Sequence, residues 1–142
     1  NRLVAVKVLK EELRSDEDLR RRFHTESEAM AKLNQNNIVK VFDVSLNSKN
    51  EYFVMEIVDG ITLKQYIKQR GVLSMKEALH FTVQILKALE HAHKKKIVHR
   101  DIKPQNIFVN RYGDYKLGDF GIAKTMEKGK IYIVGGVKMI VK

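Results

Sequence analysis

The chain has 142 residues, of which 44% are hydrophobic and 31% charged, and it contains no cysteine. This composition is typical of one modest soluble domain, and the lack of cysteine excludes disulfides and thiolate metal sites. The net charge of +10 is scattered, and no aromatic residues interleave its densest cluster, Lys94-Lys95-Lys96. We therefore interpret the basic residues as a solvated face and expect no nucleic-acid partner.

An apolar, β-branched run over residues 3–9 predicts a strand that contains one lysine, Lys7. A helix is predicted to follow, capped by Ser15 and with acidic residues in its first turn. Four large apolar residues at helical spacing mark its inward face: Leu19, Phe23, Met30 and Leu33.

A carboxylate lies on that apolar helix face. Glu26 falls between the inward-facing positions, where an unpaired charge is costly. We expect Lys7 of the preceding strand to be its partner. Glu28 is two positions further on and points away, so it is the poorer candidate.

Two strand-like runs come next, residues 38–44 and 51–58, joined as a hairpin by the polar residues 45–50. Leu63–Arg70 predicts a short helix that ends at Gly71. Strands thus dominate the first part of the chain, and the pattern changes near Val58.

A long helix and a second hairpin are predicted in the later part. Ser74 and Glu77 form an S-x-x-E capping box at the start of the helix. An apolar stripe follows along it: Ala78, Phe81, Thr82, Ile85, Ala88, Leu89 and Ala92. Residues 107–109 and 115–117 read as the two strands of a hairpin.

The tract His99-Arg100-Asp101-Ile102-Lys103-Pro104-Gln105-Asn106, followed by Asp119-Phe120-Gly121, places two carboxylates, a lysine and an amide in one short stretch. Phosphoryl transfer needs such groups: one to orient a hydroxyl, others to hold magnesium, and a cation near the moving phosphate. The tract matches the motifs H-R-D-L-x-x-x-N and D-F-G, with only the Leu exchanged.

On these motifs the chain resembles the middle of a eukaryotic-type Ser/Thr protein kinase, over about residues 2–124. The runs Glu51-Tyr52-Phe53-Val54-Met55-Glu56 and Gly60-Ile61-Thr62-Leu63 are similar to bacterial members. Among those, the membrane-anchored kinases with extracellular PASTA repeats are the most similar.

The resemblance implies an α+β, kinase-like fold of two lobes that is incomplete. Residues 1–55 are expected to form a partial N-lobe of antiparallel sheet and one helix, and residues 56–58 the hinge. Residues 59–124 are expected to form a partial helical C-lobe, and residues 125–142 an atypical C-terminal tail.

The resemblance also implies which residues bind ATP. Val4-Ala5-Val6-Lys7 matches the V-A-I-K strand, so Lys7 would hold the α- and β-phosphates, with Glu26 as its ion-pair partner. The expected adenine contacts are Ala5 and Phe108 on the two purine faces, Met55 at the back of the pocket, and the hinge residues from Glu56 to Val58.

In the same way the resemblance assigns the chemistry. Asp101 would orient the substrate hydroxyl and Lys103 would neutralise charge on the transferring phosphoryl group; Asn106 and Asp119 would hold Mg²⁺. His99 is interpreted as a packed structural residue, and Arg100 as the partner of a phosphorylated activation loop.

The chain also departs from the family pattern. No G-x-G-x-x-G loop precedes Val4, so we expect one upstream; after Gly121 no A-P-E follows and Thr125 is the only Ser or Thr. Residues 128–136 read like a hairpin of unrelated origin. We interpret the sequence as a gene fragment, a disrupted reading frame or a truncated gene prediction, in that order.

Two functions are compatible with this sequence. One is an ATP-dependent kinase of protein Ser/Thr hydroxyls in the cytoplasm, with any membrane anchor in the full-length parent. The other is a non-catalytic remnant or binding module, because the glycine-rich loop and lower C-lobe are absent. We expect the chain alone to be inactive, with an apolar helix stripe left exposed.

Overall fold

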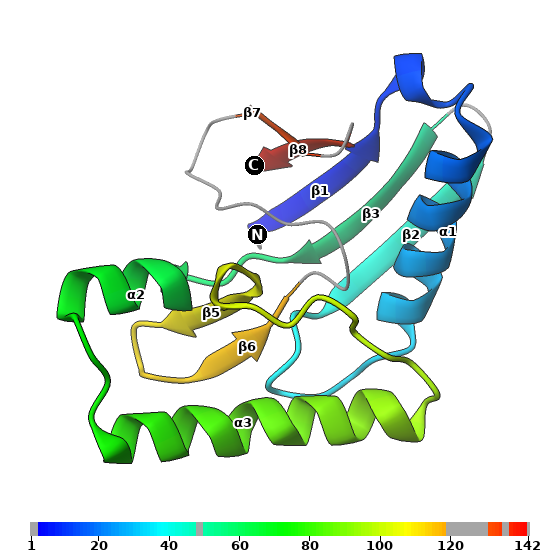
Figure 1. The fold of residues 1–142 in the computed structure, drawn as a ribbon. Coiled ribbons are helices and arrows are strands. Elements are labelled where there is room, and N and C mark those ends of the chain that lie inside the picture. The colour runs from blue at the N-terminus through cyan, green and yellow to red at the C-terminus, as the bar shows by residue number, and fades with distance from the viewer. Residues whose placement is uncertain (1–2, 48–49, 119–130, 135–136, 142) are drawn as a thin grey trace. The chain divides into compact units, whose positions relative to one another are not determined.

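The computed structural model describes residues 3–47, 50–118, 131–134 and 137–141. These residues fall into two compact units. Figure 1 shows the chain coloured by residue number, from blue at the N-terminus to red at the C-terminus. The first unit contains the described residues of Asn1–Leu33, Lys40–Ile57 and Met126–Lys142, and the second those of Asn34–Val39 and Val58–Thr125. Both units combine helices with antiparallel strands, which confirms the predicted α+β class.

The first unit is built on a five-stranded antiparallel sheet in the order β2-β3-β1-β8-β7 (Figure 1). Its strands are β1 (Val4–Leu9), β2 (Val41–Asn47), β3 (Asn50–Glu56), β7 (Ile131–Val134) and β8 (Val137–Val141). β1 is central, with β3 on one side and β8 on the other, so both of its edges are hydrogen-bonded. Strands β7 and β8, from the end of the chain, therefore belong to this sheet.

Burial alternates along β1 as expected for a strand with one face on a core. Ala5, Lys7 and Leu9 have no exposed surface. Helix α1 (Glu17–Ala31) runs beside β2 and β3 in Figure 1 and buries Phe23 and Met30 completely. The predicted inward helix face is thus confirmed at these two positions.

The start of α1 differs from the prediction by one residue. Asp16, not Ser15, is the N-cap, because its carboxylate accepts a hydrogen bond of 3.0 Å from the Leu19 amide. The Ser15 hydroxyl instead donates to the Glu12 carbonyl at 3.4 Å, after the 3₁₀ turn Glu11–Leu13.

The first predicted hairpin strand also begins later than expected. β2 starts at Val41, and the apolar residues Ile38 and Val39 lie in the second unit. There the Val39 amide donates to the Leu117 carbonyl at 2.9 Å, and Ile38 forms a parallel bridge with Leu117. The predicted run 38–44 is thus divided between the second unit and strand β2, and the periodicity of the sequence alone does not reveal this division.

A buried carboxylate joins α1 to β3. Glu51 has no exposed surface, and its Oε1 lies 2.5 Å from Arg20 Nε and 3.3 Å from His24 Nε2. Arg20 and His24 are one helical turn apart, so α1 presents both to the same strand residue. Removal of one partner from such a pair leaves a charge in a low-dielectric environment.

We predict that Arg20→Ala lowers the free energy of unfolding by about 3 kcal/mol, because Glu51 would lose its guanidinium partner. The matched control is Arg21→Ala, whose pair with Asp18 is exposed on both sides and should contribute less than about 1 kcal/mol. Chemical denaturation of the purified variants measures both. Equal effects of the two substitutions would contradict the assignment.

The second unit contains a three-stranded antiparallel sheet in the order β4-β5-β6, with strands β4 (Gly60–Thr62), β5 (Ile107–Asn110) and β6 (Tyr115–Leu117). The β5–β6 hairpin was predicted, whereas β4 was not. At Gly60 a Cβ atom would lie 1.9 Å from the Val109 carbonyl oxygen, so β4 approaches β5 too closely for any side chain there.

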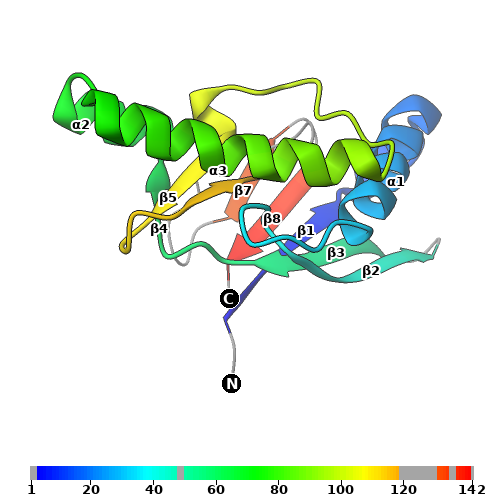
Figure 2. The same cartoon turned by 90° about the horizontal axis from the view of Figure 1, so that it is seen from below.

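Three helices complete the second unit: α2 (Leu63–Arg70), α3 (Met75–Lys94) and the 3₁₀ turn η2 (Pro104–Asn106). α2 packs on β5 and α3 on β6, and Figure 2 shows α3 running along this sheet. The predicted end of α2 at Gly71 is confirmed, with a φ of 85° that favours glycine. None of the described helices combines the length and apolarity that a membrane span needs.

The apolar face of α3 is only partly the predicted one. Ile85, Ala88 and Ala92 are buried, but Thr82 is exposed and donates its hydroxyl to the Ala78 carbonyl at 2.7 Å. The expectation that this stripe stays exposed is therefore wrong at Ile85, Ala88 and Ala92. The large apolar side chains that α3 does expose are others: Met75, Leu79, Val83 and Leu86. They recur at helical spacing and form one exposed stripe.

The predicted capping box of α3 is present, and its Glu77 also contacts two residues of α2. Ser74 donates to Glu77 Oε2 from its amide at 2.9 Å and from its hydroxyl at 2.7 Å. The Tyr66 hydroxyl donates to Glu77 Oε1 at 2.7 Å and Arg70 lies 3.0 Å from it. These hydrogen bonds, first that of Tyr66 and then those of Ser74, lower the pKa of Glu77 to about 2.

This pKa predicts how stability depends on pH. Because the folded-state pKa lies below the ordinary value, the Glu77 carboxylate stabilises the fold above pH 4.5, and the contribution is lost as the pH falls towards about 2. Glu77→Gln should therefore lower stability at pH 7, and its difference from the unsubstituted protein should narrow on acidification through that range.

Denaturation curves at several pH values measure this difference. Glu12→Gln, at an exposed position outside any capping box, is the control and should not change stability at pH 7. A difference between Glu77→Gln and the unsubstituted protein that stays constant from pH 7 down to pH 2 would contradict the prediction.

Candidate active site

In the first unit, Lys7 and Glu26 form the predicted ion pair. Lys7 Nζ lies 3.4 Å from Glu26 Oε1, and the two residues are 0% and 8% exposed. The ammonium also lies 5.0 Å from the centre of the Phe53 ring, at cation–π distance. Glu28 is exposed, so the choice between the two carboxylates is confirmed.

We predict that Glu26→Gln lowers the free energy of unfolding by about 3 kcal/mol, because a buried ammonium would lose a carboxylate partner. Glu28→Gln is the matched control and should change it by less than about 0.5 kcal/mol. Equilibrium denaturation measures both variants. If Glu26→Gln left the free energy of unfolding unchanged, the Lys7–Glu26 pair would not be what holds α1 on β1.

The residues that the family resemblance assigns to adenine lie in both units. In the first, Ala5 and Met55 are 0% and 5% exposed, and the Glu56 amide donates to the Lys40 carbonyl at 2.8 Å. In the second, the Val58 carbonyl accepts from the Gly60 amide at 2.9 Å, and Phe108 is half-buried.

In the second unit, the tract around Asp101 brings its polar side chains together. Lys103 Nζ lies 2.7 Å from Asp101 Oδ2. Asn106 Nδ2 donates both to that oxygen at 3.0 Å and to the Asp101 carbonyl at 2.8 Å. The Asn106 amide donates to the Lys103 carbonyl at 2.9 Å, which closes the 3₁₀ turn η2. Asp101, Lys103 and Asn106 therefore form one hydrogen-bonded cluster.

The electrostatics of this cluster keep Asp101 ionised. The hydrogen bond from Lys103 lowers the pKa of the Asp101 carboxyl below its ordinary value, against the opposing effect of desolvation, and the Asn106 amide adds to the shift. An ionised, half-buried carboxylate can accept a hydrogen bond from a hydroxyl group and orient it.

His99 is a packed structural residue, as predicted. It is 3% exposed; its Nδ1 accepts from the Asp101 amide at 3.2 Å and its Nε2 lies 3.0 Å from the Gly118 carbonyl oxygen. Because Nδ1 accepts, Nε2 carries the proton that is donated to Gly118. The ring thus fixes the backbone at Asp101. Arg100, which lies between His99 and Asp101 in the sequence, has a φ of 66°, an uncommon conformation for a non-glycine residue.

Gly118 was not singled out from the sequence. Its carbonyl accepts from His99, and its amide donates to the Asn106 carbonyl at 2.8 Å. A Cβ atom at this position would lie 2.5 Å from Phe108 Cε2, so a side chain here would require the Phe108 ring to shift. The sequence feature that could have drawn attention to Gly118 is its position directly before Asp119.

The expected magnesium ligands are Asn106 and Asp119. Asp119, with Phe120 and Gly121, lies outside the described residues. Asn106 is fully buried, and its Nδ2 makes both side-chain contacts to Asp101. Its Oδ1 has no hydrogen-bond partner among the described residues. A free amide oxygen is a suitable ligand for a hard cation such as Mg²⁺. In the described ranges no three His, Cys, Asp or Glu side chains are grouped for metal binding.

The chain belongs to the protein kinase domain family, whose model matches residues 1–138. This finding confirms the family that the catalytic tract indicated.

Its relatives include named bacterial kinases. The chain is 48% identical over 131 residues to a Clostridium perfringens protein named "Probable serine/threonine-protein kinase", with 92% of this chain and 19% of that protein covered. It is 43% identical to serine/threonine-protein kinase PrkC of Bacillus subtilis, where 92% of this chain and 20% of PrkC are covered. With PknA of Mycobacterium tuberculosis it shares 40% identity over 96% of this chain and 33% of PknA.

Solved structures agree with this family. The kinase domain of Mycobacterium tuberculosis PknI superposes with a TM-score of 0.71 at 34% identity, over 84% of this chain and 48% of that chain. A second structure of that domain gives 0.71 at 32% identity, over 89% and 52%. The predicted kinase fold is confirmed, and the chain spans about half of these domains and about a fifth of PrkC.

Proposed function

We propose that this chain supplies catalytic machinery of a protein serine/threonine kinase, which transfers the γ-phosphoryl group of ATP to Ser or Thr hydroxyls of proteins. The observation that carries the proposal is the cluster of Asp101, Lys103 and Asn106, with an ionised carboxylate at its centre. The names of the bacterial relatives support the same activity.

In the proposed reaction Asp101 accepts a hydrogen bond from the substrate hydroxyl and receives its proton. The hydroxyl oxygen forms a bond to the γ-phosphorus, the bond from that phosphorus to the β,γ-bridging oxygen breaks, and ADP leaves. Lys103, 2.7 Å from Asp101, would neutralise negative charge on the group in transfer. Positioning and charge stabilisation therefore account for the chemistry.

ATP and Mg²⁺ are the proposed cofactors. Lys7 is assigned to the α- and β-phosphates, and its pair with Glu26 would hold the ammonium in place. Bound Mg²⁺ would neutralise phosphate charge, and Asn106 Oδ1, together with Asp119, is assigned as its ligand.

The remaining assignments follow the family. Ala5, Met55, Glu56, Val58 and Phe108 are proposed to contact adenine. Residues 1–55 and 59–124 are proposed as the N-lobe and C-lobe portions of the kinase, on either side of the hinge. The proposed partners are cytoplasmic proteins with accessible Ser or Thr residues.

Asp101→Asn tests this function in a full-length kinase that contains this chain, because residues 1–142 alone are expected to be inactive. We predict that kcat for transfer of labelled γ-phosphate to a generic protein substrate falls by about a thousandfold, since a general base contributes on this order. The Kd for ATP should change by less than about threefold, because the substitution removes an interaction made mainly in the transition state.

Asp18→Asn is the control, because Asp18 is an exposed carboxylate of α1, and it should leave kcat unchanged. Turnover near the unsubstituted value in Asp101→Asn would remove Asp101 from its proposed role. Absence of phosphoryl transfer in the unsubstituted protein would instead favour the non-catalytic alternative.

A further inference from the structure

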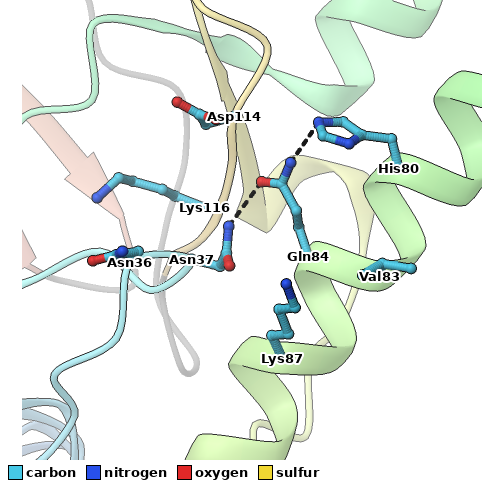
Figure 3. Close-up of a pocket in the computed structure, with 8 residues that line it drawn as sticks. All are labelled: Asn36, Asn37, His80, Val83, Gln84, Lys87, Asp114 and Lys116. Carbon is cyan, nitrogen blue, oxygen red and sulfur yellow. Dashed lines mark hydrogen bonds between the residues drawn. The ribbon is translucent and has the colours of Figure 1, made fainter.

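A single glutamine of α3 joins two segments of the second unit. Gln84 Oε1 accepts a hydrogen bond from Asn37 Nδ2 and another from the Tyr115 amide, both at 2.8 Å. Asn37 Nδ2 also donates to the Tyr115 carbonyl at 2.9 Å, so these three residues are hydrogen-bonded to one another. Figure 3 shows the Gln84 side chain reaching from α3 towards Asn37, with its amide nitrogen 2.5 Å from His80 Nε2. Gln84 therefore ties α3 both to the segment around Asn37 and to the first residue of β6.

The segment around Asn37 is itself paired with β6. The Leu117 amide donates to the Asn37 carbonyl at 2.7 Å, and the Val39 amide donates to the Leu117 carbonyl at 2.9 Å. On its other side β6 pairs with β5. Because β6 is only three residues long, these contacts and that of Gln84 with Tyr115 make up much of what holds the strand in register.

The residue after β6 contacts the Asp101 cluster. The Gly118 amide donates to the Asn106 carbonyl at 2.8 Å, and His99 Nε2 donates to the Gly118 carbonyl at 3.0 Å. Asn106 Nδ2 in turn donates to the Asp101 carboxylate, and His99 Nδ1 accepts from the Asp101 amide. A displacement of β6 would move Gly118, and with it the two residues that hold Asp101.

The hydrogen bonds of Gln84 lie in a partly buried environment. Tyr115 and Leu117 are 3% and 0% exposed, and Gly118 is buried. Without Gln84 Oε1, the Tyr115 amide and Asn37 Nδ2 would each lose an acceptor where water has little access, which is costly for a buried donor. The start of β6 is then expected to shift until these donors find other partners.

We propose that Gln84 is a positioning residue for the phosphoryl transfer assigned to the Asp101 cluster. It contributes no atom to the reaction. Through its bonds to Tyr115 and Asn37 it fixes β6; the strand fixes Gly118, and Gly118 fixes the cluster. This inference rests on the proposed function. A displacement of about 1 Å at a reacting group can lower its rate about a hundredfold, so a small shift of β6 is enough to slow the reaction.

Two substitutions of Gln84 test this role in a full-length kinase that contains this chain. Gln84→Leu removes the acceptor oxygen, and we expect kcat for phosphoryl transfer to a protein substrate to fall by about tenfold. Gln84→Glu keeps an acceptor oxygen for both donors, and its other oxygen would face His80 Nε2, which can carry a proton, so kcat should stay within about twofold of the unsubstituted value. The Kd for ATP without Mg²⁺ should change by less than about threefold in either variant, because Gln84 acts on Asp101 and not on the nucleotide.

Hydrogen exchange of the Gly118 amide gives a readout that needs no activity. Gln84→Leu leaves Gly118 and its acceptor, the Asn106 carbonyl, in place. Exchange that becomes faster by about tenfold would therefore show that the loss at Tyr115 is transmitted along β6. If the unsubstituted kinase transfers no phosphoryl group, the proposed function fails, and the exchange of Gly118 alone decides whether Gln84 holds β6.

Lys87→Ala is the matched control, because Lys87 is exposed and lies about one turn further along α3; it should change neither kcat nor the exchange of Gly118. Circular dichroism verifies that each variant is folded. If Gln84→Leu does not fold, Asn37→Ala replaces it, because that variant removes one donor to Gln84 and keeps the bond to the Tyr115 amide.

Three results would overturn the proposal. The Gln84→Leu kinase, or Asn37→Ala in its place, could keep the kcat of the unsubstituted protein. It could lose kcat without faster exchange at Gly118. Gln84→Glu could lose as much kcat as Gln84→Leu, which would show that the acceptor oxygen is not what matters.

Discussion

A charge removed from water has to be compensated inside the protein, and this constraint organises the first unit. Lys7 lies on the buried face of β1 with no exposed surface, and Glu26 of α1 lies 3.4 Å from its ammonium. Glu51 of β3 is buried as well and pairs with Arg20 of the same helix. Two charge pairs therefore fix α1 on the sheet, one to each of two neighbouring strands.

The second unit uses buried hydrogen bonds instead. His99 donates to Gly118 and accepts from the Asp101 amide, while Asn106 donates to the Asp101 side chain and carbonyl. The last three of these contacts fix the backbone or the carboxylate of Asp101, and the first holds the His99 ring in place. An active-site group held in this way needs little reorganisation during a reaction. Among the described residues, Asn106 Oδ1 is buried and has no hydrogen-bond partner, so it is available to a ligand.

Sequence reasoning succeeded where the chemistry of a residue restricted its environment. The Lys7–Glu26 pair and the capping box at Ser74 were predicted because an unpaired buried group or helix end is costly. The packed His99 was predicted because Asp101 already supplies the base in the family motif. Sequence reasoning failed where a partner lies far along the chain. The bridge of Ile38 with Leu117 depends on tertiary contacts that no local pattern encodes.

The proposed function is phosphoryl transfer to protein hydroxyls, with Asp101 beside Lys103 at the centre of the proposed machinery. The most direct measurement is phosphoamino acid analysis after incubation of a full-length kinase that contains this chain with Mg²⁺, γ-labelled ATP and a protein substrate. The account predicts label on phosphoserine or phosphothreonine. Label on phosphotyrosine alone, or no label in any amino acid, would contradict it.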